Sequence, residues 1–188
     1  MFIEDGTGSG NSAQVTDENL LKTLAITRSL ENHANQDEGE AYNALFAVNP
    51  DGAGDCIFYL KNNSNTDLII ESIWWQTSAA EEVYYKLGDV GVPVLTNGSV
   101  ITPANLNAGS GNSADCTCYS NTADGATDIT GLSGGTTIQQ LWLTSAQSTL
   151  FNCEADIVLT KNQVFTIYCV GGDTLLRGTL SFHYHDSK

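Results

Sequence analysis

One serine of the chain lies in a pattern that many hydrolases use. Residues 131–135 read Gly-Leu-Ser-Gly-Gly, which matches the G-x-S-x-G nucleophile elbow and would make Ser133 a nucleophile. That chemistry needs a strand before the serine and a helix after it, so that the hydroxyl sits on a sharp turn. Here Thr136, Thr137 and Ile138 predict a second strand instead of a helix. The sequence therefore favours a loop, predicts no catalytic residue and indicates that the protein is not an enzyme.

A second possible chemistry is phosphate binding by glycine-rich turns. The tract Gly-Ser-Gly-Asn-Ser-Ala occurs twice, at residues 8–13 and 109–114. A phosphate loop needs a lysine and a helix that opens behind the glycines, but neither tract has a nearby lysine and acidic residues flank both. We interpret both tracts as backbone joints, because glycine permits positive φ and the close approach of another backbone. Asn107 and Asn112 can bond a neighbouring main chain.

Metal binding is the third chemistry that the residue types allow. His183 and His185 are two apart on one face of a predicted strand, and Cys116 and Cys118 could add sulfur ligands if the two strands were neighbours. Two carboxylate pairs in glycine-containing loops could hold Ca²⁺, although neither loop has the EF-hand spacing. These pairs are Asp51 with Asp55, and Asp124 with Asp128. We favour solvated histidines at an exposed strand end and predict no metal and no cofactor, with His183, His185, Asp124 and Asp128 as the remaining candidates.

The charge of the chain limits its partners. Its 188 residues, enough for one ordinary domain, carry 22 acidic and 7 basic side chains, a formal net charge of -15. Nucleic acid and anionic membranes both require clustered lysine and arginine, so we expect neither as a partner. A basic protein surface or a divalent cation fits this charge better. No apolar run approaches 18 residues, and the acidic start MFIEDGTGSG does not resemble a secretory signal, so we expect the protein to stay in the cytosol or to leave by lysis.

The five cysteines indicate a reducing compartment. Cys116 and Cys118 point to one face of a strand and do not form an easy disulfide. Cys56 and Cys169 alternate with apolar neighbours and are typical of buried thiols. We therefore expect all five to be reduced.

Apolar and β-branched runs separated by Gly, Asn and Asp predict an all-β domain. The predicted strands are 56–61, 68–76, 83–87, 99–102, 115–119, 138–144, 157–160, 164–170 and 176–185. In the last strand, the face from Leu176 to Tyr184 is expected to be buried, and the face from Arg177 to His185 is expected to be wet. Short strands with long polar loops favour an antiparallel β-sandwich of the jelly-roll kind.

The first forty residues differ in composition from the rest. Residues 1–40 contain eight acidic and two basic residues and few aromatics. We predict an extended N-terminal arm over 1–40, followed by a β-sandwich domain over 41–188. Apolar positions within 18–35, with Thr16 as a possible cap, are compatible with a helix, whereas residues 21–28 also fit a strand. Both alternatives remain open for this segment.

Two pairs of consecutive aromatic residues suggest a subunit contact. Trp74 and Trp75 are neighbours in one predicted strand, and Tyr84 and Tyr85 are neighbours in another, so each pair points to both faces of its sheet. A two-layer sandwich covers only one of these faces. One Trp and one Tyr must then be covered by the arm, by a loop or by another subunit, and we favour the subunit.

Three segments carry a resemblance to a known group of proteins. FIEDGTGSGNSAQVTDENLLKT, VITPANLNAGSGNSAD and YLKNNSNTDLIIESI resemble small structural proteins of tailed-bacteriophage virions, and the chain is similar to capsid decoration (cement) proteins with a jelly-roll-like domain. The likeness covers the arm, the 101–107 segment and the β-rich C-terminal half. It implies a non-enzymatic subunit that trimerises and grips the outer capsid surface, and that family has no catalytic residues to carry over.

We therefore expect a virion structural protein, a decoration protein that stabilises the head. Its expected partners are the major capsid protein and further copies of itself in a homotrimer, on a capsid assembled in the host cytoplasm. The alternative is a tail or fibre-associated protein that recognises a host surface glycan through Trp74 or Trp142. Head or tail location, symmetry and partner identity remain open. The residues expected at contacts are Asp5, Gly6, Gly8, Gly10, Trp74, Tyr84, Pro103, Asn105, Asn107 and Gly109.

Overall fold

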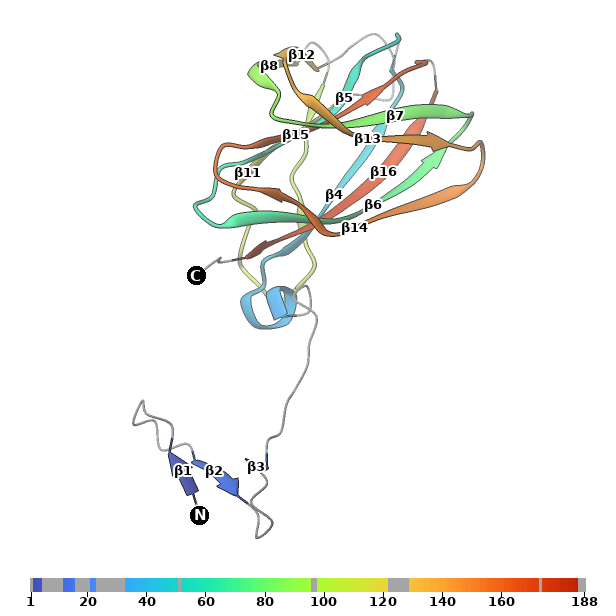
Figure 1. Cartoon of the computed structure of the whole chain (residues 1–188). Helices are drawn as coiled ribbons and strands as arrows, with labels where there is room; N and C mark the ends of the chain where they lie inside the picture. Colours follow the sequence, from blue (N-terminus) through green and yellow to red (C-terminus); the bar gives the residue numbers. More distant parts are fainter. Residues whose placement is uncertain are drawn as a thin grey trace. The chain divides into compact units, whose positions relative to one another are not determined.

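The computed structural model describes residues 33–50, 52–95, 98–121, 129–172 and 174–185, and the backbone of short strands at 2–4, 12–15 and 21–22 (Figure 1). Side chains at 154–156 lie outside the description. The contacts of the chain divide it into two units, Met1–Leu30 and Glu31–Lys188. This division falls ten residues before the boundary that the sequence predicted near residue 40, and whether the domain folds without the arm stays a prediction.

The first unit contains a small antiparallel sheet. Its strands are β1 (Phe2–Glu4), β2 (Ser12–Val15) and β3 (Leu21–Lys22), in the order β1-β2-β3. The segment that was left open between helix and strand thus contains the short strand β3. Its last two residues, Ala34 and Asn35, begin a π-helix, η1 (Ala34–Glu38), which belongs to the second unit.

Eight long strands of the second unit form a jelly roll. In chain order they are β4 (Ala41–Val48), β5 (Cys56–Asn62), β6 (Asp67–Thr77), β7 (Glu81–Leu87), β13 (Thr136–Leu143), β14 (Ser148–Leu159), β15 (Val164–Cys169) and β16 (Leu176–His185). Their pairing is nested, because β4 pairs with β16, β5 with β15, β6 with β14 and β7 with β13, all antiparallel. The predicted all-β, jelly-roll-like sandwich is therefore confirmed.

The nested pairs lie in two facing sheets (Figure 1). One sheet has the order β10-β4-β16-β6-β14, where β10 is Ala104–Asn105. The other has the order β13-β7-β15-β5-β11-β9, where β11 is Cys116–Ser120 and β9 is Ser99–Val100. A separate two-stranded sheet pairs β8 (Val90–Leu95) with β12 (Ile129–Ser133). The sequence predicted most of the long strands but did not predict β4, β8 or β12.

The main core fills the space between the two large sheets with side chains from both inner faces. Trp75 and Tyr85 are fully buried there, and the Trp75 indole N–H donates to the Tyr85 hydroxyl oxygen over 2.7 Å. A smaller cluster on the other side of the six-stranded sheet joins Cys56, Tyr59, Val164 and Ile129. Since Ile129 lies on β12, the β8–β12 sheet covers part of that outer face.

The last strand follows the predicted alternation except near its end. From Leu176 to Tyr184 every second residue is buried, as the period of two predicts. His183, which was expected to be solvated, is only 1% exposed, so that prediction was wrong. The register between β16 and β6 shifts here, because Ser181 faces Ser72 while Phe182 faces Ile70. This bulge leaves Glu71 as the extra residue of β6, and its carboxylate lies 2.6 Å from His183 Nδ1.

The described cysteines are free thiols, and four of them are buried: Cys56, Cys118, Cys153 and Cys169. The expected burial of Cys56 and Cys169 is confirmed. Among the described residues, no helix has the length and apolar character needed to cross a membrane.

Candidate functional site

The Gly-Leu-Ser-Gly-Gly motif connects two strands. Ser133 ends β12, and β13 begins at Thr136, so the strand predicted behind the motif is confirmed. The Gly135 N–H donates to Asp89 Oδ1 over 2.8 Å, and a Cβ at Gly135 would collide with that carboxylate. Gly131, Leu132 and Ser133 therefore belong to β12, so the predicted loop is wrong for these three residues, and only Gly134 and Gly135 form the connection that Asp89 holds.

Asp89 is itself fully engaged in hydrogen bonds. Besides the Gly135 N–H, its carboxylate accepts the Thr166 hydroxyl over 2.5 Å and the Tyr168 hydroxyl over 3.1 Å. Burial, followed by the nearby Cys56 and Asp89, raises the pKa of Tyr168, which keeps this phenol protonated as a donor. Through these three hydrogen bonds the Asp89 carboxylate connects the loop before β13 to β15.

Residues 105–112, which include part of the second glycine-rich tract, form side-chain hydrogen bonds with η1 and Gly39. Amide N–H groups of Asn105, Asn107 and Asn112 donate to the main-chain carbonyls of Gly39, Asn35 and Glu38, over 2.7, 3.0 and 3.0 Å. The Ser110 hydroxyl adds a bond to the Gly39 carbonyl over 3.2 Å. We call these four side chains the asparagine clamp. It bonds two main-chain carbonyls of η1 and that of Gly39, the residue that ends the helix.

Glycine is required where the clamp closes. Gly39 has φ +65°, and a Cβ at this position would lie 2.5 Å from the Ser110 hydroxyl oxygen. Both the left-handed backbone and the close approach favour glycine. Gly109 and Gly111 themselves have neither a positive φ nor a close backbone neighbour, so the reason predicted for the glycines of this tract is wrong, and its contacts come from Ser110 and Asn112. Gly109 is exposed and Pro103 is half-buried, whereas Asp5, Gly6, Gly8 and Gly10 lie outside the described residues.

The candidate metal ligands are not brought together. His183 and His185 lie on the outer face of the five-stranded sheet, whereas Cys116 and Cys118 pack with the main core from the six-stranded sheet. Within the described part of the chain, no group of three His, Cys, Asp or Glu side chains is placed to hold a metal ion. Asp124, Asp128 and Asp51 lie outside it, and Asp55 accepts the Gly52 N–H over 2.9 Å.

The outer face of the five-stranded sheet carries aligned rows of side chains. In the central row, Leu45, Thr179, Trp74 and Leu150 are direct neighbours across β4, β16, β6 and β14. Leu45, Trp74 and Leu150 are 61%, 38% and 63% exposed, whereas Trp75 is fully buried, so the opposite orientation predicted for the two tryptophans is confirmed.

Two further rows flank the central row; one is uncharged and the other contains a single charged residue, Arg177. They are Asn43, Ser181, Ser72 and Asn152 on one side, and Ala47, Arg177, Gln76 and Ser148 on the other. We call these twelve residues the Trp74 face. None of the twelve is acidic, although the chain has 22 acidic residues, and Arg177 is the single charged member.

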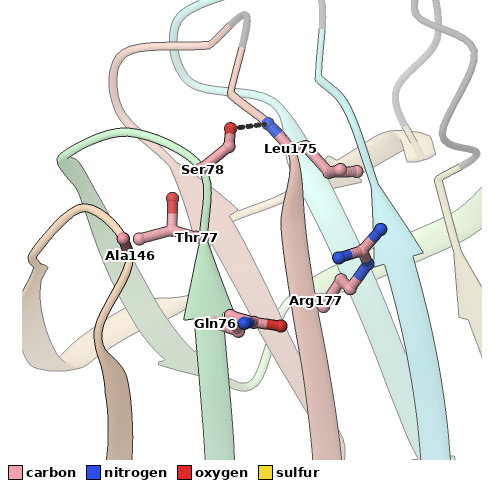
Figure 2. Close-up of a pocket in the computed structure, with 6 residues that line it drawn as sticks. All are labelled: Gln76, Thr77, Ser78, Ala146, Leu175 and Arg177. Atoms are coloured by element: carbon pink, nitrogen blue, oxygen red, sulfur yellow. Dashed lines mark hydrogen bonds between the residues drawn. The ribbon is translucent and has the colours of Figure 1, made fainter.

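Two hollows in this face meet at Arg177. A shallow groove of about 400 Å³ runs over the small residues Ala47 and Thr179, between Leu45 and Trp74. A pocket of about 220 Å³ lies at the end of β6 and is lined by Gln76, Thr77, Ser78, Ala146, Leu175 and Arg177 (Figure 2). In Figure 2 the Arg177 side chain leans from β16 towards β4, and the Leu175 N–H donates to the Ser78 hydroxyl. Arg177 therefore borders both hollows.

The sequence pointed to Trp74 but missed Arg177. The sequence did contain a signal for Arg177, because it is the one lysine or arginine on the predicted solvent-exposed face of the last strand. Its importance comes from its neighbours on β4 and β6, which only the register reveals. Tyr84, the other aromatic expected at a contact, is half-buried on the outer face of the six-stranded sheet.

Comparisons of the chain with protein-family models, with curated proteins and with solved structures found no match.

Proposed function

We propose that the protein is a non-enzymatic structural subunit of a virion, a decoration protein that binds the outer capsid surface and stabilises the head. Two features support the proposal: the resemblance of the arm and of the 101–107 segment to phage structural proteins, and the jelly-roll fold. The partner is the major capsid protein. The observation that carries most weight is the asparagine clamp.

The clamp fixes the point from which the arm leaves the domain. Residues 35–39 are bonded by side chains of residues 105–112, some seventy positions away in the chain. An acidic segment with few aromatics has little apolar surface of its own to bury and gains stability from a partner. Because the root of the arm is held in place, less conformational freedom is lost when the arm binds a particle. The arm then serves as the attachment and the jelly roll as the displayed domain.

Removing residues 1–15 tests the arm directly. We expect the truncated protein to melt like the full chain, because the strands of the jelly roll begin at Ala41. Its binding to virions of the phage that encodes the chain should weaken about tenfold, on the order of 1.4 kcal/mol. Co-sedimentation with separated heads and tails measures the binding and also distinguishes a head from a tail location.

A second variant separates the arm from its anchor. The double variant Asn107→Ala, Asn112→Ala keeps the arm but removes two of the hydrogen bonds that hold η1, so binding should weaken by less than in the truncation.

Salt should also slow the association of the full chain with the particle, because Glu4 and Asp5 carry charge in the arm. Equal binding by the full chain and the truncated protein would show that the arm is not the attachment, and co-sedimentation with neither heads nor tails would refute the proposal.

A further inference from the structure

Arg177 has no acidic partner among the residues that the structure describes. It is the only lysine or arginine among the residues of the five-stranded sheet, and it forms no ion pair with any described residue. The twelve positions of the Trp74 face contain no carboxylate that its side chain could reach. In a chain with three times as many acidic as basic residues, an arginine on an acid-free face is available for an anion from outside.

The charge of Arg177 argues against a second copy facing the first. If two Trp74 faces packed against each other, each guanidinium would lose water without gaining a carboxylate. An unpaired buried charge is strongly unfavourable. The occupant must therefore bring its own anion, and the planar guanidinium fork matches a carboxylate in two parallel hydrogen bonds.

The rest of the site matches a sugar ring. Trp74 offers a partly exposed aromatic face beside the groove, and Leu45 forms the opposite wall. Neutral hydrogen-bonding groups follow along the two hollows: the Gln76 amide and the Thr179 and Ser78 hydroxyls. The side-chain amide of Gln76 makes no hydrogen bond with the described residues, so its two donors and its acceptor are available to a ligand. A groove of about 400 Å³ with one aromatic wall and few polar groups is in the size range of small-ligand sites.

We propose that the Trp74 face binds a carboxylate-bearing sugar, with Arg177 on the carboxylate and Trp74 against the apolar face of the ring. This role replaces the subunit contact that the sequence suggested for Trp74. It goes beyond capsid attachment, which we assign to the arm, and gives the displayed domain a ligand of its own.

Titrations with acidic and neutral sugars of similar size test the site. The probes are sialyllactose and trigalacturonic acid, with lactose and maltotriose as their neutral counterparts, followed by ligand-detected NMR on the full chain. We expect the acidic sugars to bind at least about tenfold more tightly than the neutral ones. Arg177→Gln should remove this preference, and Arg177→Lys should restore only part of it, because an ammonium lacks the fork.

The role of Trp74 is tested by its replacement, and a second exposed tryptophan, Trp142, provides the matched control. Trp74→Ala should abolish binding of every sugar, whereas Trp142→Ala, which removes another exposed tryptophan on β13, should leave it unchanged. All four variants alter exposed side chains and should melt like the parent, and Arg177→Gln should still sediment with virions. Equal affinity for acidic and neutral sugars, unchanged binding by Arg177→Gln, or binding of an oligoglutamate peptide without binding of the acidic sugars would overturn the proposal.

Discussion

At the scale of single residues, the buried Trp75–Tyr85 hydrogen bond gives the sharpest prediction. Tyr85→Phe removes the acceptor and leaves the Trp75 indole N–H buried without a partner. We expect a loss of about 1–3 kcal/mol in the free energy of unfolding, the usual penalty for an unsatisfied buried donor. Chemical denaturation measures it. Tyr84→Phe is the control on the outer face and should have almost no effect; equal losses in both variants would contradict the role of the hydrogen bond.

The buried thiols predict a loss of stability at alkaline pH. Burial raises the pKa of Cys116 from 9.0 to about 11 and that of Cys169 from 9.0 to about 12. In the unfolded chain both thiols ionise near pH 9, whereas in the fold they stay protonated. Their contribution is therefore complete below pH 9 and is lost as the pH rises through the folded values. The melting temperature should fall steadily above pH 9.

Thiol labelling checks the redox state that this argument assumes. All five cysteines should react after denaturation without reductant, and the native protein at neutral pH should react slowly because four of its five thiols are buried. A disulfide in freshly prepared protein, detected by mass spectrometry, would exclude the reducing compartment.

At the scale of elements, the asparagine clamp should govern the stability of η1. The Asn105 amide donates to both the Gly39 and the Asn112 carbonyls, so Asn105→Ala removes two bonds at once. We expect faster hydrogen exchange at Glu40, whose N–H donates to the Ala34 carbonyl, with little change in the sheets. Asn152→Ala, on the exposed Trp74 face, should not alter it. Unchanged exchange in Asn105→Ala would mean that η1 holds without the clamp.

At the scale of the whole molecule, exposed apolar side chains predict self-association. On β8, Val90, Val92 and Val94 are each more than half exposed. Pro93 has no N–H to donate, which limits strand pairing along the edge of β8 that β12 leaves free. We expect a homotrimer at micromolar concentration, with more than about 1,000 Å² buried in each contact. Light scattering should give three times the chain mass of 20.1 kDa. Val92→Asp should dissociate the trimer, and a monomer throughout this range would contradict the prediction.

The amino-acid sequence by itself determined most of the long strands and the alternation of side chains between their two faces. Alternation with a period of two is a local property, so Trp74 and Trp75, and likewise Tyr84 and Tyr85, could be assigned to opposite faces of their sheets before any partner strand was known. The strand that follows the Gly-Leu-Ser-Gly-Gly motif was predicted from a local signal in the same way. β4 and β8 escaped this reasoning because β4 has apolar residues on both of its faces, and because Gly91 and Pro93 interrupt β8.

Only the tertiary structure decided which strands meet and in which register. The nested pairing places Leu45, Trp74 and Arg177 on one face, although more than one hundred residues separate Trp74 from Arg177. His183 became buried because a bulge sets Glu71 beside it, and no local pattern indicates where a ladder will shift. The asparagine clamp also depends on tertiary structure, since the side chains of Asn107 and Asn112 donate to carbonyls of η1 that lie more than seventy residues earlier in the chain. Local alternation depends on neighbours in the chain, whereas the binding face and the clamp depend on contacts between distant segments that form only when the sheets close.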